Sequence, residues 1–218
     1  MKAKICGVKN FETLNFIINH KYPPKFLGFI CNYRKSKRYL NYKNLKKLLN
    51  HKKKKKIKFV SVLVNPNEII LRKIKKLNFD YLQLYDVSPK KTKVIKKKFK
   101  IKIITAITVK NLKDVLKYKN FVNISEIILF DSKGYEKSLG FNHQLLKNVT
   151  HPINKMLAGN IKYNDKLDKY EKITDIIDIS GSLETRGEKD NLKIDKFLRN
   201  IKKVNDKDKK KNSANRSA

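Results

Sequence analysis

Cysteine is scarce in this chain of 218 residues, which contains only Cys6 and Cys31. Two thiols in a lysine-rich chain do not make a disulfide scaffold, so we expect reduced cysteines and a cytoplasmic protein. Hydrophobic runs are short as well. The N-terminus lacks the apolar segment of a signal peptide, and no apolar run approaches the roughly 18 residues of a membrane span. We therefore expect no membrane partner.

Histidine and cysteine are also absent from the spacings that bind metals. The four histidines, His20, His51, His143 and His151, are scattered along the chain. None is paired with a second histidine or a cysteine, as zinc and similar ions require. The sequence therefore predicts no metal site.

Negative charge is the third deficit: 54 Lys and Arg stand against 19 Asp and Glu, a formal net charge of +35. Clustered cations bind nucleic acid by releasing its counterions, so a basic nucleic-acid-binding protein is one alternative function. Arginine, which recognises phosphates and bases in a bidentate manner, is nevertheless rare. The lysines are spread over all the predicted helices and accompany many Ile and Asn, as an AT-rich genome would produce. We expect no specific nucleic-acid partner.

What the chain does contain is an alternation of short apolar segments and longer amphipathic ones. The apolar segments predict strands at 3–6, 26–30, 58–64, 81–84, 101–107, 126–130, 154–158 and 175–179. Helical patterns follow Asn10, open at Asn65-Pro66-Asn67-Glu68, and cover 41–49, 111–118, 142–146, 164–170 and 191–204. Apolar strands separated by helical stretches of about 10–15 residues indicate a parallel sheet with helical crossovers.

Eight such units predict a single-domain α/β protein, a (β/α)8 TIM barrel over residues 1–205. An open, doubly wound sheet is the alternative, although no G-x-G-x-x-G pattern opens a helix. From about residue 206 apolar residues other than alanine disappear. We therefore predict a short, disordered, basic tail over 206–218.

Polar or small residues follow several of the predicted strands, on the face where such barrels have their active sites. They are Cys6-Gly7, Gln83 within the fourth strand, Asp131-Ser132, Ala158-Gly159-Asn160, and the run from Asp178 to Ser182. Small residues after the seventh and eighth strands expose backbone N–H groups that can bind a phosphate. Cys6 and Asp131 then supply two titratable groups for proton transfer.

These segments resemble the phosphoribosylanthranilate isomerase family of tryptophan biosynthesis. The resembling segments are Lys4-Ile5-Cys6-Gly7, Lys35-Ser36-Lys37-Arg38-Tyr39, Val64-Asn65-Pro66, Leu82-Gln83-Leu84, Phe130-Asp131-Ser132, Leu157-Ala158-Gly159, Asp178 to Glu184, and Gly187-Glu188-Lys189-Asp190. They occur in the family's order from Lys4 to about Val204.

The chain departs from the family pattern at several places. Tyr85-Asp86 replaces a His-Gly, Asn160 replaces the second glycine after strand seven, and Lys37 replaces a proline. Ser-Gly is permuted to Gly181-Ser182. The glycine-rich loop after strand six is reduced to the shorter, charged segment Gly134–Gly140.

The resemblance implies a cofactor-free Amadori rearrangement of N-(5-phosphoribosyl)anthranilate to 1-(2-carboxyphenylamino)-1-deoxyribulose 5-phosphate. Asp131 would be the general acid that protonates the furanose ring oxygen, and Cys6 the general base that removes the C2′ proton. The remaining implied contacts involve the substrate: Arg38 with the anthranilate carboxylate, Asp178 and Gln83 nearby, and Gly159, Asn160, Ser180, Gly181 and Ser182 around the phosphate.

The implied partner is a small phosphorylated molecule, and the implied assembly is a monomer or homodimer. Another phosphosugar-binding barrel enzyme remains an alternative beside the nucleic-acid-binding protein.

Overall fold

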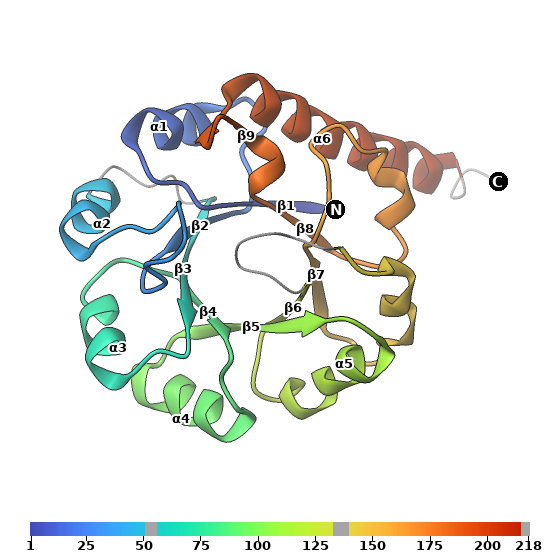
Figure 1. Ribbon diagram of the computed structural model, residues 1–218. Helices are drawn as coiled ribbons and strands as arrows, with labels where there is room; N and C mark the ends of the chain where they lie inside the picture. The colour runs from blue at the N-terminus through green and yellow to red at the C-terminus, as the bar shows by residue number, and fades with distance from the viewer. Residues whose placement is uncertain (51–55, 133–139, 215–218) are drawn as a thin grey trace.

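The computed structural model describes residues 1–50, 56–132 and 140–214, and Figure 1 looks along the axis of the barrel that they form. Its eight parallel strands are β1 (Lys2–Cys6), β2 (Phe26–Ile30), β3 (Lys58–Val64), β4 (Tyr81–Tyr85), β5 (Lys102–Val109), β6 (Ile127–Ser132), β7 (Asn154–Leu157) and β8 (Ile176–Ile179). Each strand pairs with the next, and β8 pairs with β1, which closes the barrel.

Helices surround the barrel on the outside (Figure 1). They are α1 (Phe11–Asn19), α2 (Tyr42–Leu49), α3 (Glu68–Lys75), α4 (Pro89–Phe99), α5 (Leu112–Leu116) and α6 (Asn191–Ala214), with the 3-10 helices η1 (Lys117–Phe121), η2 (His143–Asn148), η3 (Leu167–Tyr170) and η4 (Gly181–Leu183). A two-stranded hairpin of β9 (Glu184–Thr185) and β10 (Glu188–Lys189) follows β8.

Asparagine and serine residues decide where the first five α-helices begin. Each N-cap side chain accepts a hydrogen bond from the backbone N–H three residues further on, which satisfies one of the amides left over at a helix start. The caps are Asn10, Asn41, Asn67, Ser88 and Asn111. Some of the abundant asparagines of this sequence therefore serve as helix N-caps.

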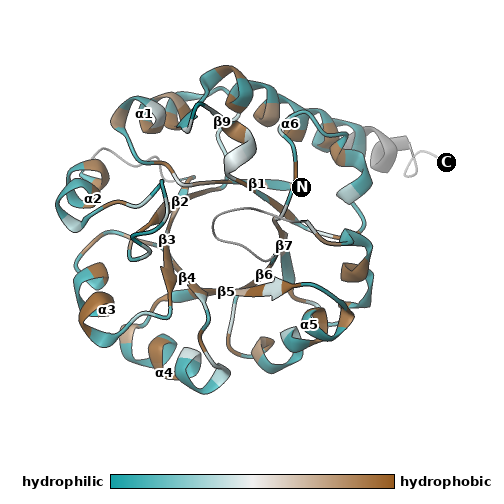
Figure 2. Ribbon diagram, in the orientation of Figure 1, coloured by the Kyte–Doolittle hydropathy of each residue, from teal (hydrophilic) through white to brown (hydrophobic). Residues whose placement is uncertain are grey.

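Apolar residues are buried in two layers, one inside the barrel and one between the strands and the helices. The inner layer includes Val60, Leu129 and Met156, and the outer layer includes Phe29 and Phe59, whose rings meet edge to face with centroids 5.2 Å apart. Figure 2 shows hydrophobic residues running along β3 to β5 and mixed colouring on the helices. Successive strand residues face opposite layers, as a pleated strand requires.

The predicted barrel is confirmed, and each of the eight predicted strands lies where a strand is found. One helix, α4, was not predicted, because its eleven residues include six lysines and only Val94, Ile95 and Phe99 as large apolar residues. Ser88-Pro89 is the start signal that could have identified it, since Ser88 caps the helix and Pro89 stands in its first turn. The predicted helices at 142–146 and 164–170 correspond to the 3-10 helices η2 and η3.

The last helix extends further than the sequence analysis predicted. The predicted boundary between barrel and tail, at residues 205 and 206, falls inside α6, which continues to Ala214. Ion pairs of Lys202 with Asp206 and of Lys207 with Asp168 lie on both sides of this boundary. Residues 215–218 of the predicted tail lie outside the described part of the chain. Within that part, no helix combines the length and the apolar character needed to cross a membrane.

The end of α4 generates a stability prediction. Lys100 follows the helix in the left-handed conformation (φ 45°, ψ 51°), and its N–H donates to the carbonyl of Lys96. Lys100→Gly removes the steric penalty of a side chain in that conformation, so we expect the free energy of unfolding to rise by about 1 kcal/mol.

The same substitution at Lys93, an exposed position inside α4, is the matched control and should lower the free energy of unfolding by about 1 kcal/mol. Urea-induced unfolding followed by circular dichroism measures both variants. Two shifts of the same sign would contradict this account of the helix end.

Candidate active site

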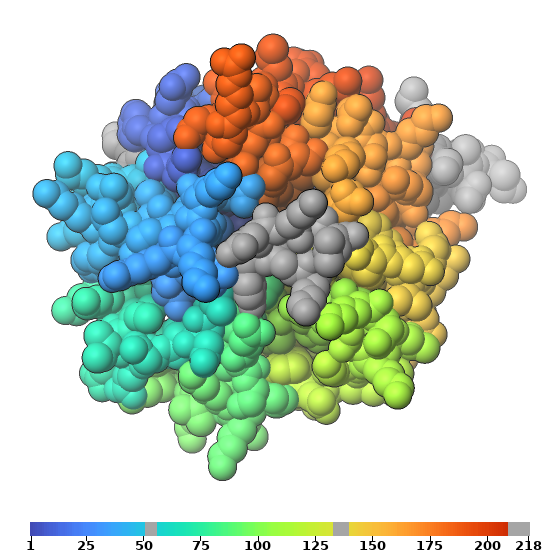
Figure 3. Space-filling view, in the orientation of Figure 1, coloured from blue at the N-terminus to red at the C-terminus, as the bar shows by residue number. Residues whose placement is uncertain are grey.

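A cavity of about 490 Å³ is formed by residues at the carboxyl ends of the strands and in the loops that follow them. Its lining includes Cys6 of β1, Tyr85 of β4, Asp131 of β6 and Asp178 of β8. Because the barrel is closed, the first and last parts of the chain lie side by side, as the blue and orange surfaces of Figure 3 show. Residues far apart in the sequence therefore share this one cavity.

The cavity brings together nearly all of the residues predicted from the sequence. Its wall contains Cys6, Arg38, Asp131, Gly159, Asn160, Asp178, Ser180, Gly181 and Ser182. Gln83 is the exception: its side chain is fully buried in the barrel interior, where its amide nitrogen donates to the Tyr85 hydroxyl at 3.3 Å. Of the segment Gly134–Gly140, only Gly140 is among the described residues.

Cys6 ends β1 with its side chain turned into the barrel. Gly7 follows with φ +77°, a conformation that favours glycine, and the stem of Arg38 packs directly against the position where a Cβ would stand. The chain can therefore turn away from the strand and leave the thiol at the cavity wall. Burial raises the pKa of Cys6; the charge of Lys4 opposes this effect and that of Asp178 adds to it.

Asp131 is held by both of its carboxylate oxygens. Oδ1 accepts a hydrogen bond from the backbone N–H of Ser132 at 2.8 Å, and Oδ2 accepts one from the Tyr85 hydroxyl at 2.8 Å. Burial raises the pKa of this carboxyl, the Tyr85 hydrogen bond lowers it, and the charge of Asp178 raises it again, to about 6. Near neutral pH the group can therefore exchange a proton in either direction.

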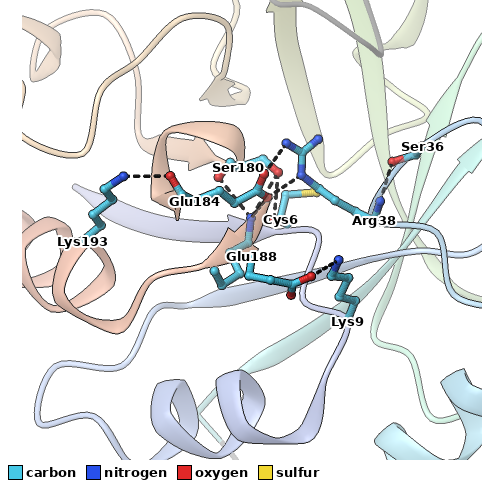
Figure 4. A network of polar contacts seen from close by, with 9 residues as sticks. Cys6, Lys9, Ser36, Arg38, Ser180, Glu184, Glu188 and Lys193 are labelled. Carbon is cyan, nitrogen blue, oxygen red and sulfur yellow. Dashed lines mark hydrogen bonds and ion pairs between the residues drawn. The ribbon is translucent and has the colours of Figure 1, made fainter. Parts of the chain in front are cut away.

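Arg38 reaches the cavity from the loop after β2 and forms a fork-like ion pair with Glu184 of β9 (Figure 4). Nε lies 2.5 Å from Oε1 and Nη2 lies 2.7 Å from Oε2. Lys189 of β10 also donates to Glu184 at 2.7 Å and to the carbonyl of Ser180 at 3.0 Å. The hairpin β9–β10 therefore determines where the guanidinium stands, and its remaining N–H groups can bind an anion.

Two loops, after β7 and after β8, form another part of the wall, and the second borders Arg38, since a Cβ on Gly181 would lie 3.2 Å from its Nη2. Gly159 adopts φ +90°, and a Cβ there would lie 3.0 Å from the backbone nitrogen of Ser132. Its carbonyl accepts a hydrogen bond from Nε2 of His143 at 2.9 Å. The Ser182 hydroxyl accepts one from the N–H of Tyr163 at 2.7 Å, which ties the two loops together. Gly159, Asn160, Gly181 and Ser182 of these loops line the cavity.

Two departures from the family pattern have a simple conformational explanation. Asn160 and Asp86 stand where the family has glycine, and both adopt φ +54°. Asparagine and aspartate tolerate this left-handed region better than other residues with a side chain. The substitutions therefore preserve the turns after β7 and β4.

Tyr85, Lys4 and Glu184 are site residues whose roles the sequence analysis did not predict. Tyr85 takes the place of the family's histidine and binds Asp131, whereas Lys4 forms a buried ion pair with Asp178 at 2.7 Å. The signal for Lys4 was present, because a strand places residues i and i+2 on the same face, here the face of Cys6. Among the described residues, no group of His, Cys, Asp and Glu side chains could hold a metal ion.

Comparison with known proteins agrees with this geometry. The sequence matches the family described as N-(5'phosphoribosyl)anthranilate (PRA) isomerase over residues 3–200. The N-(5'-phosphoribosyl)anthranilate isomerase of Clostridium acetobutylicum is 31% identical, over 93% of this chain and 98% of the relative. The enzyme of the same name from Campylobacter jejuni is 33% identical, over 93% of this chain and 100% of the relative.

Solved structures show the same fold. The phosphoribosyl anthranilate isomerase of Thermotoga maritima superposes with a TM-score of 0.81 at 24% identity, over 93% of this chain and 98% of that one. A structure of such an isomerase in complex with reduced 1-(o-carboxyphenylamino)-1-deoxyribulose 5-phosphate has a TM-score of 0.79 at 24% identity, with the same coverage.

The contact between Tyr85 and Asp131 leads to a prediction about ionisation. Tyr85→Phe removes a hydrogen bond that stabilises the charged carboxylate, so we expect the pKa of Asp131 to rise above its value of about 6. A ¹³C NMR titration of the aspartate carboxyls measures this shift.

Tyr81→Phe, the same substitution at the opposite end of β4, is the control and should leave the Asp131 titration unchanged. An Asp131 titration that stays in place, or moves to lower pH, in Tyr85→Phe would contradict the assigned contact.

Proposed function

This chain belongs to the N-(5'-phosphoribosyl)anthranilate isomerase family, and from that premise we propose that Cys6 and Asp131 are the base and the acid of its isomerisation. The observation that carries this proposal is their place in one cavity, on strands β1 and β6. Burial raises both pKa values. Asp131 can thus hold a proton near neutral pH, while the thiolate of Cys6 is a strong base once it forms.

The reaction needs one proton delivered and one removed. Asp131 gives its proton to the ring oxygen of the ribose as the bond from that oxygen to C1′ breaks, and the nitrogen lone pair forms a C1′=N bond. Cys6 then removes the proton from C2′, and the electron pair of that C–H bond produces an enolamine. Tautomerisation to the ketone adds a proton to C1′ and removes the O–H proton from the C2′ oxygen; the first can come from the Cys6 thiol and the second can return to Asp131, which restores both groups. Atoms and electrons balance within the substrate, so the net change is an isomerisation.

The phosphate of the substrate would lie against the loops after β7 and β8. Gly159, Asn160, Gly181 and Ser182 line the cavity there, and Lys162, another lining residue, carries a positive charge. The backbone amides of loops built from small residues are suited to phosphate oxygens. Small residues at these positions let the anion approach the backbone.

The anthranilate group would occupy the side of the cavity near β2 and β3. Ile30, Val62 and Val64 form an apolar surface there, and Arg38 lies on the same wall. An aromatic ring can pack on the apolar surface while its carboxylate pairs with the guanidinium. Asp178 is paired with Lys4, so we propose that it lies at the floor of the site, near the anthranilate and not in contact with it.

At neutral pH the proton that the reaction needs on Asp131 is held by Cys6. The pKa of Asp131, about 6, lies below the raised pKa of Cys6, so aspartate and thiol prevail at neutral pH. The reactive arrangement, thiolate and carboxylic acid, has the same total number of protons. Its population is therefore independent of pH between the two pKa values and decreases outside them.

The wider setting follows from the family. The enzyme acts in tryptophan biosynthesis on a small phosphorylated substrate. We infer a cytoplasmic location and a monomeric or homodimeric assembly; a related structure is of monomers generated from a dimeric Thermotoga maritima isomerase.

Removing either proposed catalytic group should decrease turnover strongly. We expect Cys6→Ala and Asp131→Ala each to lower kcat by about 10²–10⁴-fold, the range for general acid–base groups. Turnover is measured by the loss of phosphoribosylanthranilate fluorescence. Cys31→Ala, the same substitution at the other cysteine, should retain near-full turnover because Cys31 is not in the cavity lining. Near-full turnover in Cys6→Ala would refute its assignment as the base.

The pH profile offers a second test. Below pH 6 both groups carry protons and Cys6 cannot form the thiolate, so kcat/KM should fall tenfold per pH unit. Between about pH 6 and the raised pKa of Cys6 we expect a plateau that extends beyond about pH 8.5, the usual range of a thiol. Stopped-flow or steady-state rates over this range decide the matter. An alkaline decline that begins near neutral pH would contradict the assignment of Cys6.

A further inference from the structure

Lys4 is an unusual residue for the middle of a barrel strand. It stands between Ala3 and Ile5 in β1, and its side chain is 0% exposed. Because side chains alternate along a strand, Lys4 and Cys6 both point into the barrel. An ammonium group in such a place loses its hydration and is retained only where other groups compensate for the loss.

Asp178 of β8 provides part of that compensation. It is the direct neighbour of Lys4 in the β1–β8 ladder, and its Oδ2 accepts a hydrogen bond from Nζ at 2.7 Å. The other carboxylate oxygen, Oδ1, is buried and has no hydrogen-bond partner among the described residues. An ammonium group has three donors, so one bond to Asp178 leaves Lys4 able to bind a second acceptor.

The thiol of Cys6 lies close to the Lys4 ammonium group, where it can serve as the second acceptor. A Cβ placed on Gly28 of β2 would lie 2.8 Å from Sγ of Cys6 and 3.2 Å from Nζ of Lys4. The two head groups therefore share the space that any other residue at position 28 would fill with its side chain. A glycine on β2 thus allows a sulfur and an ammonium from β1 to lie close together inside the barrel.

We propose that Lys4 is a positioning residue that stabilises the thiolate of Cys6, and that Asp178 competes with this thiolate for the same ammonium group. The inference rests on the proposed role of Cys6 as the base. While Cys6 is a thiol, Lys4 and Asp178 form a neutral pair. When Cys6 loses its proton, Lys4 is the adjacent cation, and the new negative charge does not remain uncompensated in the barrel.

The electrostatics of the site agree with this arrangement. Burial alone would lower the pKa of Lys4, but the charges of Asp178 and Cys6 raise it, so Lys4 stays protonated. The charged and titratable groups that face Cys6 are Lys4, Arg38, Cys31, Tyr85, Asp178 and Lys189. The other two cations, Arg38 and Lys189, both pair with Glu184. Lys4 is therefore the cation of this group that does not pair with Glu184.

The test measures the ionisation of Cys6 directly and does not depend on turnover. In a Cys31→Ser background, the rate of alkylation of Cys6 by iodoacetamide is followed against pH. Cys31 donates to the carbonyl of Phe29 at 3.1 Å, a contact that serine can also make. Because Cys6 lines the cavity, the small reagent can reach its sulfur.

The two partners of the ion pair should act in opposite directions. Lys4→Met removes the cation, and we expect the alkylation inflection to move up by about 1–3 pH units. Asp178→Asn removes the competing carboxylate and leaves the cation in place, so the inflection should move down. If the ion pair had only a structural role, both substitutions would lower the thermal stability and neither would shift the alkylation inflection.

Lys58→Met and Asp80→Asn are the matched controls, because they disrupt an ion pair at the opposite end of the barrel. Neither should move the Cys6 inflection. If Lys4→Met does not fold, Asp178→Asn decides alone: an inflection that is unchanged or higher overturns the proposal. Loss of the proposed function would instead appear as full turnover in Cys6→Ala, so the two failures are distinguishable.

Discussion

The buried ion pair between Lys4 and Asp178 is the interaction on which this structure most depends. It lies at the seam where β8 meets β1, so it joins the first strand of the chain to the last and closes the barrel. Removal of one partner would leave an uncompensated charge in the interior, at a cost of about 3–5 kcal/mol. Asp178 lines the cavity, and both charges act on the pKa values of Cys6 and Asp131. Stability and chemistry therefore share one pair of residues.

Around this pair, the site depends on glycines, because neighbouring groups pack directly against their backbone. Gly7 faces the stem of Arg38, Gly28 faces the head groups of Lys4 and Cys6, and Gly159 faces Ser132. With only seven glycines in the chain, their concentration at these contacts is informative. Each one allows a neighbouring group to occupy space that a Cβ would otherwise take. Where the family's glycines have been replaced, Asn160 and Asp86 keep the left-handed turn.

The proposed acid, Asp131, and the proposed base, Cys6, are positioned by different parts of the fold. Asp131 is positioned by local contacts, with the next amide of its own strand and with Tyr85 two strands away in the barrel. Cys6 is positioned across the seam of the barrel by the Ser180 hydroxyl, which donates to its carbonyl at 2.9 Å, and by Gly28 of the neighbouring strand β2. Arg38 depends on a third unit, the hairpin β9–β10, through Glu184. A substitution in one unit can thus alter one function of the site and leave the others in place.

The sequence by itself determined the barrel and most of the cavity wall. Apolar strand segments and asparagine caps are local signals, and the alternation of strand and helix admits few topologies. The lysine-rich helix α4 was missed because too few apolar residues mark its buried side. Tertiary structure alone decided which polar groups meet: that Tyr85 binds Asp131, that Glu184 holds Arg38, that Gln83 donates to Tyr85 inside the barrel, and that Lys4 pairs with Asp178. The physical reason is that these contacts depend on strand register and barrel closure, which bring together residues up to 174 positions apart.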